Sequence, residues 1–176
     1  MGMSVTISAA TEQDAEQILK LQYLCYQAEA ALYDDYSIQP LTQTLDDLRA
    51  ELGDACVVVA RLGTEVVGAV RGSVGADGTA AIDKLIVHPR MQHHGLGGRL
   101  LDAVEERLTA ERSAKRYRLL AGHRSEGNLR LYRSHGYEPV GTEQLSPRLD
   151  LVTLEKEAAA AKAAADGTQR ACVASA

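Results

Sequence analysis

The sequence lacks the features that mark several specialised classes of protein. Its 176 residues contain no run of the ~20 apolar residues that a membrane span requires, so no transmembrane helix is expected. Lys and Arg number 19 against 24 Asp and Glu, and this formal net charge of −5 argues against nucleic-acid binding. The opening Met-Gly-Met-Ser holds no basic segment leading into an apolar run, so no secretory signal is expected.

Cysteine is also scarce, and the aromatic residues are of one kind. The three cysteines, Cys25, Cys56 and Cys172, are odd in number and widely spaced, which favours free thiols over a disulfide framework or a zinc site. A cytoplasmic location is therefore expected. The chain has no Phe and no Trp, so its seven tyrosines supply all of its aromatic chemistry.

The pattern of apolar residues indicates a folded α/β (α+β) domain with a mixed sheet and helices on its faces. Strands are expected near residues 4–8, 55–60, 66–74, 79–87, 117–121, 137–141 and 148–154. Helices are expected near residues 12–32, 44–52, 98–112 and 125–135. These elements predict one domain over residues 1–154, followed by an Ala-rich tail over 155–176 that has no apolar stripe and is expected to be frayed or disordered.

The most informative segment is a glycine-rich turn that follows the strand ending at Val87. Gly95, Gly97 and Gly98 lie where the next helix begins, and the free N–H groups of a helix start favour phosphate binding. A plain strand–turn–helix connection explains the glycines about equally well. Arg99 and Leu100 depart from the P-loop and dinucleotide patterns respectively, so neither an NTPase nor a Rossmann dehydrogenase is supported.

Two segments together resemble the GNAT acetyltransferase superfamily. Residues 92–97, Gln-His-His-Gly-Leu-Gly, are similar to its acyl-CoA signature Arg/Gln-x-x-Gly-x-Gly/Ala. Residues 131–137, Leu-Tyr-Arg-Ser-His-Gly-Tyr, look like its Leu-Tyr-x-x-x-Gly-Phe/Tyr block. The resemblance covers about residues 4–154 and implies a single-domain fold with a mixed, mostly antiparallel sheet of six to seven strands flanked by about four helices.

The resemblance also implies acetyl-CoA as co-substrate. In the family the strand ending at Val87 and the strand over 117–121 splay apart, so the pantetheine arm can lie between them. The pyrophosphate would sit over the amides of residues 93–98, and the N–H of Val87 would face the thioester carbonyl. The implied acetyl-CoA-binding residues are Leu85, Ile86, Val87, Gln92, His93, His94, Gly95, Leu96, Gly97, Gly98, Asn128 and Tyr132.

Tyr132 is the candidate acid, because a phenol near the sulfur can protonate the leaving thiolate. A half-buried aromatic that packs a helix on the sheet is the alternative reading. The adjacent histidines His93 and His94 are not expected to bind a metal, because neighbouring side chains rarely converge on one ion.

Asp83 is the candidate base, because the acceptor amine must lose a proton before it attacks. Period-two alternation places Asp83 on the same strand face as Val87. A carboxylate paired with Lys84 or Arg71 fits the sequence equally well. His123 is held in reserve for the same role.

The acceptor is expected to be a small cationic amine. The acidic and aromatic loop formed by Tyr33, Asp34 and Tyr36 attracts ammonium groups by charge and by cation–π contact, although a solvated polar loop is at least as consistent with the sequence. Two other functions stay open: a regulatory acyl-CoA-binding module without transferase activity, and an acetyltransferase that acts on protein amines. Many GNAT members dimerise, so a homodimer is also open.

Overall fold

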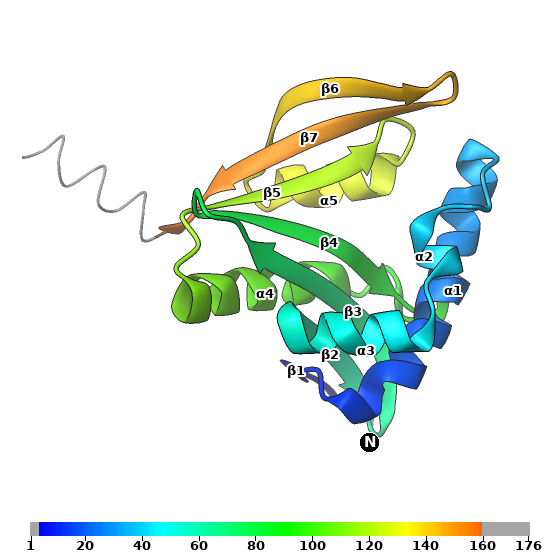
Figure 1. Cartoon of the computed structure of the whole chain (residues 1–176), viewed down its shortest axis with the longest axis vertical. Coiled ribbons are helices and arrows are strands. Elements are labelled where there is room, and N and C mark those ends of the chain that lie inside the picture. The colour runs from blue at the N-terminus through cyan, green and yellow to red at the C-terminus, as the bar shows by residue number, and fades with distance from the viewer. Residues whose placement is uncertain (1–3, 160–176) are drawn as a thin grey trace, which may run out of the picture.

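The computed structural model describes residues 4–159, which form a seven-stranded sheet with helices on both faces (Figure 1). The strands are β1 (Val5–Ala9), β2 (Cys56–Leu62), β3 (Glu65–Val74), β4 (Thr79–Val87), β5 (Arg116–Gly122), β6 (Glu138–Ser146) and β7 (Leu149–Glu157). The α-helices are α1 (Ala15–Tyr33), α2 (Gln39–Thr42), α3 (Leu45–Asp54), α4 (Leu96–Arg112) and α5 (Glu126–Ser134), and the short 3₁₀ turns η1 (Glu12–Asp14) and η2 (Pro89–Met91) precede α1 and α4.

The strand order is β1-β2-β3-β4-β5-β7-β6, and all neighbouring pairs are antiparallel except β4 with β5. This sheet confirms the expected mixed, mostly antiparallel architecture. The single-turn helix α2 was not expected, because Pro40 indicated a loop. Proline is tolerated there because it lies in the first turn, where its missing N–H has no intrahelical partner.

Two apolar layers fix the helices on the sheet. Ile18 of α1 and Leu48 of α3 pack with Val59 of β2 on one face. Val58 packs on the opposite face with a cluster that includes Leu100 of α4. Successive residues of β2 are therefore buried on opposite faces, which explains why its sequence is apolar without interruption.

The expected domain boundary at Leu154 lies inside the last strand, because β7 runs on to Glu157. Glu155 accepts two hydrogen bonds from Arg118 of β5, and Lys156 donates to the buried Glu105 of α4. The first residues of the predicted tail thus belong to the sheet. The rest of that tail from residue 160, including Cys172, lies outside the described residues.

The strands β4 and β5 pair only at their first three positions and then diverge (Figure 1). β5 instead pairs along its whole length with β7. Residues 82–87 of β4 therefore have no partner strand on the β5 side, and this gap positions the site described below. Within residues 4–159, no helix is both long and apolar enough to cross a membrane.

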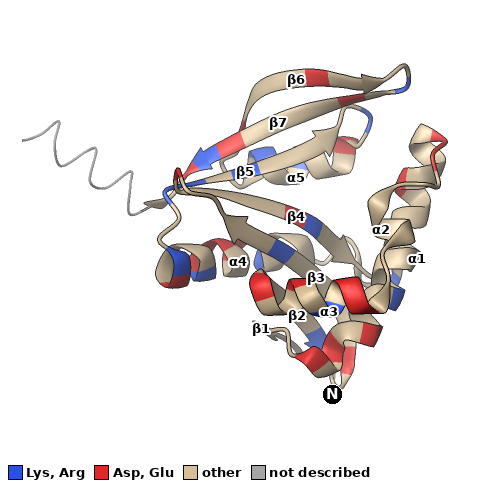
Figure 2. Ribbon diagram, in the orientation of Figure 1, with Lys and Arg blue, Asp and Glu red and all other residues tan. Residues whose placement is uncertain are grey.

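A network of charged side chains covers the α3 side of the sheet. Figure 2 shows the acidic residues of α3 beside the basic residues of β3 and β4. Glu51 of α3 accepts from Arg71 at 2.5 Å and from Lys84 at 3.3 Å. Lys84 also donates to Gln43 at 2.9 Å. These contacts join the α2–α3 segment to the middle of β4.

Candidate active site

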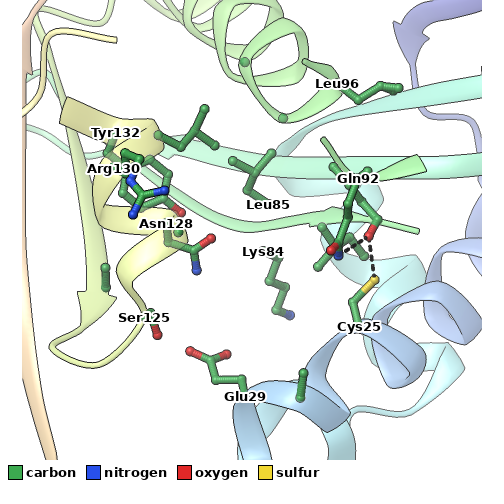
Figure 3. Close-up of a pocket in the computed structure, with 18 of the residues that line it drawn as sticks. Cys25, Glu29, Lys84, Leu85, Gln92, Leu96, Ser125, Asn128, Arg130 and Tyr132 are labelled. Carbon is green, nitrogen blue, oxygen red and sulfur yellow. Dashed lines mark hydrogen bonds between the residues drawn. The ribbon is translucent and has the colours of Figure 1, made fainter. Parts of the chain in front are cut away.

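A cavity of about 800 Å³ opens where β4 and β5 separate. Its lining comes from α1, β4, the turn before α4, the start of α4, β5 and α5 (Figure 3). All but one of the residues predicted to bind acetyl-CoA line it. The exception is His94, whose side chain is exposed and lies outside the lining.

The start of α4 forms one end of the cavity. Gly95 precedes the helix with φ of 78°, a left-handed conformation that glycine adopts without strain. The first backbone bond of the helix runs from Arg99 N–H to the Gly95 carbonyl, so the N–H groups of residues 96–98 have no intrahelical partner. A Cβ at Gly98 would lie 2.6 Å from Nε2 of His135. The turn therefore offers free backbone donors and a positive helix dipole to an anion.

The peptide group of Val87 borders the cavity at the end of β4. The carbonyl oxygen of Val87 accepts from Nε2 of Gln92 at 3.2 Å and from Sγ of Cys25 at 3.4 Å (Figure 3). The next N–H, that of His88, donates to Val67 on β3. Because N–H groups alternate between the two edges of a strand, the N–H of Val87 points away from β3, toward the cavity.

Tyr132 lies on α5, with 5% of its surface exposed, and contributes to the cavity wall. Its ring centroid is 6.2 Å from that of Tyr137, in a tilted arrangement. Burial raises the pKa of Tyr132, and the negative charges of Glu29 and Asp83 raise it further. The phenol therefore keeps its proton at neutral pH and can donate a hydrogen bond.

The expectation that Asp83 shares a strand face with Val87 is wrong, because β4 bulges between them. Lys84 has φ of 51°, and two residues of β4 oppose one residue of β3 between the flanking pairs. The bulge reverses the alternation, so Ile82 packs in the α4 cluster whereas Ile86 packs in the α1 cluster. Asp83 and Val87 consequently face opposite sides of the sheet.

Asp83 is also held by a cation. Arg71 donates to its two carboxylate oxygens at 2.7 and 2.5 Å, which is the pairing that the sequence left open as an alternative to the base. The reserve candidate, His123, does not belong to the cavity lining. Its Nδ1 instead accepts from the backbone N–H of Asp150 at 3.0 Å.

The residues expected to bind the acceptor do not line the cavity. Tyr33 is buried, and its hydroxyl lies 2.9 Å from Oγ of Ser125. Asp34 accepts from Arg148 in the β6–β7 turn at 2.5 Å, and Tyr36 is 56% exposed. Tyr33 and Asp34 therefore connect the end of α1 to the β5–α5 and β6–β7 loops.

The sequence did not indicate that α1 supplies a wall of the cavity. Cys25, Tyr26, Glu29 and Leu32 lie on one side of this helix and all line the cavity. Burial raises the pKa of the Glu29 carboxyl and raises that of the Cys25 thiol to about 11. The spacing of three and four residues was visible in the sequence, but nothing there showed that this side faces a cavity.

Known proteins match both the sequence and this arrangement. The Acetyltransferase (GNAT) family model matches residues 15–137. No curated protein matches the sequence.

Solved structures resemble the fold at low sequence identity. The PaiA N-acetyltransferase of Thermoplasma acidophilum, in complex with coenzyme A, is 17% identical, with a TM-score of 0.72 over 88% of this chain and 99% of the other. The yncA protein of Salmonella typhimurium, with its cofactor acetyl-CoA, is 18% identical, with a TM-score of 0.71 over 88% and 94%. The ribosomal-protein-S18-alanine N-acetyltransferase of Escherichia coli is 15% identical, with a TM-score of 0.71 over the same shares of the two chains.

The family match spans the strands β2 to β5 and includes both of the segments that resembled GNAT motifs. It confirms that resemblance independently of the geometry. The chain therefore belongs to the GNAT acetyltransferase family, whose members transfer an acetyl group from acetyl-CoA.

Proposed function

We propose that the protein transfers the acetyl group of acetyl-CoA directly to the nitrogen of a small primary amine. The observation that carries this proposal is the gap between β4 and β5, with the glycine-rich start of α4 at one end and Tyr132 in its wall. A pantetheine arm can complete the unpaired edge of β4 as an added strand does. The free N–H groups of residues 96–98 suit its pyrophosphate.

Two groups of the cavity wall, the N–H of Val87 and the hydroxyl of Tyr132, can assist the reaction of the thioester. The N–H of Val87 can donate to the carbonyl oxygen as negative charge develops on it, which is an oxyanion-type contribution. The amine nitrogen forms the new C–N bond, the C–S bond breaks, and the Tyr132 hydroxyl gives its proton to the departing thiolate. Burial keeps the Tyr132 phenol protonated at neutral pH, and its place in the cavity wall supports its role as the donor to sulfur.

Direct transfer is favoured over a covalent acyl-enzyme. Cys25 is a thiol in the cavity wall, but burial raises its pKa to about 11. At neutral pH almost none of it is thiolate, and the thiolate is the form that attacks a thioester. An acetyl-cysteine intermediate therefore has no support.

A small acceptor is favoured over a protein. The ion pair between Asp34 and Arg148 joins the end of α1 to the β6–β7 turn, and the contact of Tyr33 with Ser125 joins it to the β5–α5 loop. An extended peptide would need an open groove along this side. The E. coli neighbour named above acts on a ribosomal protein, so protein amines remain the alternative to test.

Release of CoA from acetyl-CoA, measured with a panel of small amines and a panel of peptides, tests the proposal. We expect release with small primary amines that matches the amount of acetylated product found by mass spectrometry. Release with peptides alone would replace the small acceptor by a protein. Acetyl-CoA binding without release to any acceptor would indicate the regulatory module instead.

A further inference from the structure

Glu29 places a carboxylate inside the cavity, on a wall that the GNAT-like motifs do not include. It lies one helical turn after Cys25 and Tyr26 in α1, and all three line the cavity. Figure 3 shows its side chain extending from α1 into the cavity, on the side of Ser125 and Asn128.

Within the described residues no cation is paired with Glu29, and Arg130, the arginine of the lining, forms no hydrogen bond or ion pair with it. No hydrogen bond or ion pair to its carboxylate occurs among residues 4–159, whereas the other acidic residue of the lining, Asp83, is held by Arg71. The lysine of the lining, Lys84, is in turn occupied by Glu51 and Gln43. Glu29 is thus the carboxylate of the lining that is available to a ligand cation.

Glu29 also influences Tyr132, the phenol that we propose as the proton donor to the leaving thiolate. Its charge contributes to raising the pKa of Tyr26 on the same helix and of Tyr132 on α5. Burial raises the pKa of Glu29 itself. Both effects follow from a carboxylate that is partly removed from water.

We propose that Glu29 binds the ammonium group of the acceptor and takes the proton that the amine must lose before it attacks the thioester. This inference rests on the proposed function and assigns its acceptor class, a primary alkylammonium. An alkyl amine has a pKa of about 10.4, so at pH 7 only about one molecule in 2,500 is free amine. A carboxylate at the site lets the protein bind the abundant ammonium form.

The protons balance as follows. The ammonium gives one proton to Glu29, and the free amine then forms the C–N bond to the thioester carbonyl. A second proton leaves the nitrogen as the C–S bond breaks, and it replaces the one that Tyr132 donates to the thiolate. The products are the amide and CoA thiol, and Glu29 returns its proton to water before the next cycle.

Other titratable groups of the lining come from each element around the cavity. Cys25 and Tyr26 share the helix of Glu29, Asp83 and Lys84 belong to β4, His93 precedes α4, and Arg130 and Tyr132 belong to α5. Burial raises the pKa of all three cysteine and tyrosine groups, so they stay protonated at neutral pH. These three groups therefore do not compete with Glu29 as bases between about pH 6 and 9, which is the pH range of ordinary assays.

The test is the pH dependence of kcat/KM for a primary alkyl amine in the wild-type protein and in Glu29→Gln. We expect the variant to lose about 10²-fold or more at pH 7, because it depends on the scarce free amine. The loss should shrink as the pH rises toward the pKa of the amine, by up to about tenfold per pH unit. Glu29→Asp, which keeps a carboxylate, should retain the wild-type shape of the profile at a lower rate.

Glu16→Gln is the matched control, because Glu16 is an exposed glutamate of the same helix that does not line the cavity. It should behave as wild type. A wild-type to Glu29→Gln ratio that does not change with pH, with acetyl-CoA affinity intact, would overturn the role of Glu29 and leave the proposed function standing. A wild-type protein that releases no CoA with any amine would overturn both.

Discussion

Arg71 and Asp83 face each other across β3 and β4, and the guanidinium of Arg71 donates to both carboxylate oxygens of Asp83. The same guanidinium reaches Glu51 of α3, so one cation joins two strands and a helix. The pairing occupies a carboxylate that would otherwise be a natural proton acceptor beside the cavity. It also lies next to the β4 bulge at Lys84, which turns Val87 to the other face of the sheet.

Replacing Asp83 by Asn should leave the pH dependence of kcat/KM unchanged. The Asp83 side chain is 46% exposed and Arg71 retains Glu51, so we expect a stability loss of no more than about 1 kcal/mol. Urea unfolding and the pH dependence of kcat/KM measure the two effects. If the acidic limb of the profile disappeared in this variant, Asp83 rather than Glu29 would be the base.

Replacing Tyr132 by Phe should lower kcat by roughly 10²-fold and leave the affinity for acetyl-CoA nearly unchanged. The substitution removes the proton donor but keeps the buried ring and its packing against Tyr137. Turnover and calorimetric titration with acetyl-CoA separate the two quantities. An unchanged kcat would remove Tyr132 from the reaction.

Replacing Gly98 by Ala should weaken acetyl-CoA binding by about tenfold, or about 1.4 kcal/mol. The new methyl group would collide with His135, which hydrogen-bonds to Asp102 and so has a fixed position, and the start of α4 must shift. Gly53→Ala is the matched control, because a Cβ there meets nothing within 4 Å. Equal affinity in both variants would show that the cofactor does not depend on this turn.

Stability should depend on Asp14 in a defined pH range. Arg61 donates to both of its carboxylate oxygens and Thr11 N–H donates to one, and these bonds hold the pKa of Asp14 below its ordinary value despite burial. A lowered folded-state pKa means that the contribution is complete above the unfolded value of about 3.9 and is lost as the pH falls through the folded value.

We therefore expect Asp14→Asn to cost about 2 kcal/mol in free energy of unfolding at pH 7, and the difference from wild type to shrink below about pH 4. Urea unfolding at several pH values measures it. Glu106→Gln, at an exposed position of α4, is the control and should change little. If the difference in free energy of unfolding between wild type and Asp14→Asn grew as the pH fell, the pKa of Asp14 would not be lowered in the folded protein.

Much of the fold could be predicted, because the long helices carry a periodic apolar pattern and strands such as β2 carry a short apolar run between turn residues. The glycine-rich start of α4 was also predictable, because the glycines stand where a strand ends and a helix begins, whereas the contact that requires Gly98, with His135, was not visible in the sequence. The bulge was not predictable. Residues 85–87 are all apolar, so the sequence does not fix which face each one takes, and only the pairing with β3 reveals the extra residue.

The acceptor side of the site was the least predictable part. Tyr33 and Asp34 are residue types that suit an ammonium site. In the structure they instead contact Ser125 and Arg148, which lie far away in the sequence. Glu29 resembles any polar residue of a surface helix. Its place in the site depends on a cavity that forms only when β4, α1 and α5 come together.

A crystal structure of the protein with acetyl-CoA tests the central claim most directly. The account predicts the diphosphate over the N–H groups of residues 96–98, the pantetheine arm along the unpaired edge of β4, and the thioester between Val87 and Tyr132. A cofactor bound elsewhere on the protein, or none bound at millimolar concentration, would contradict it.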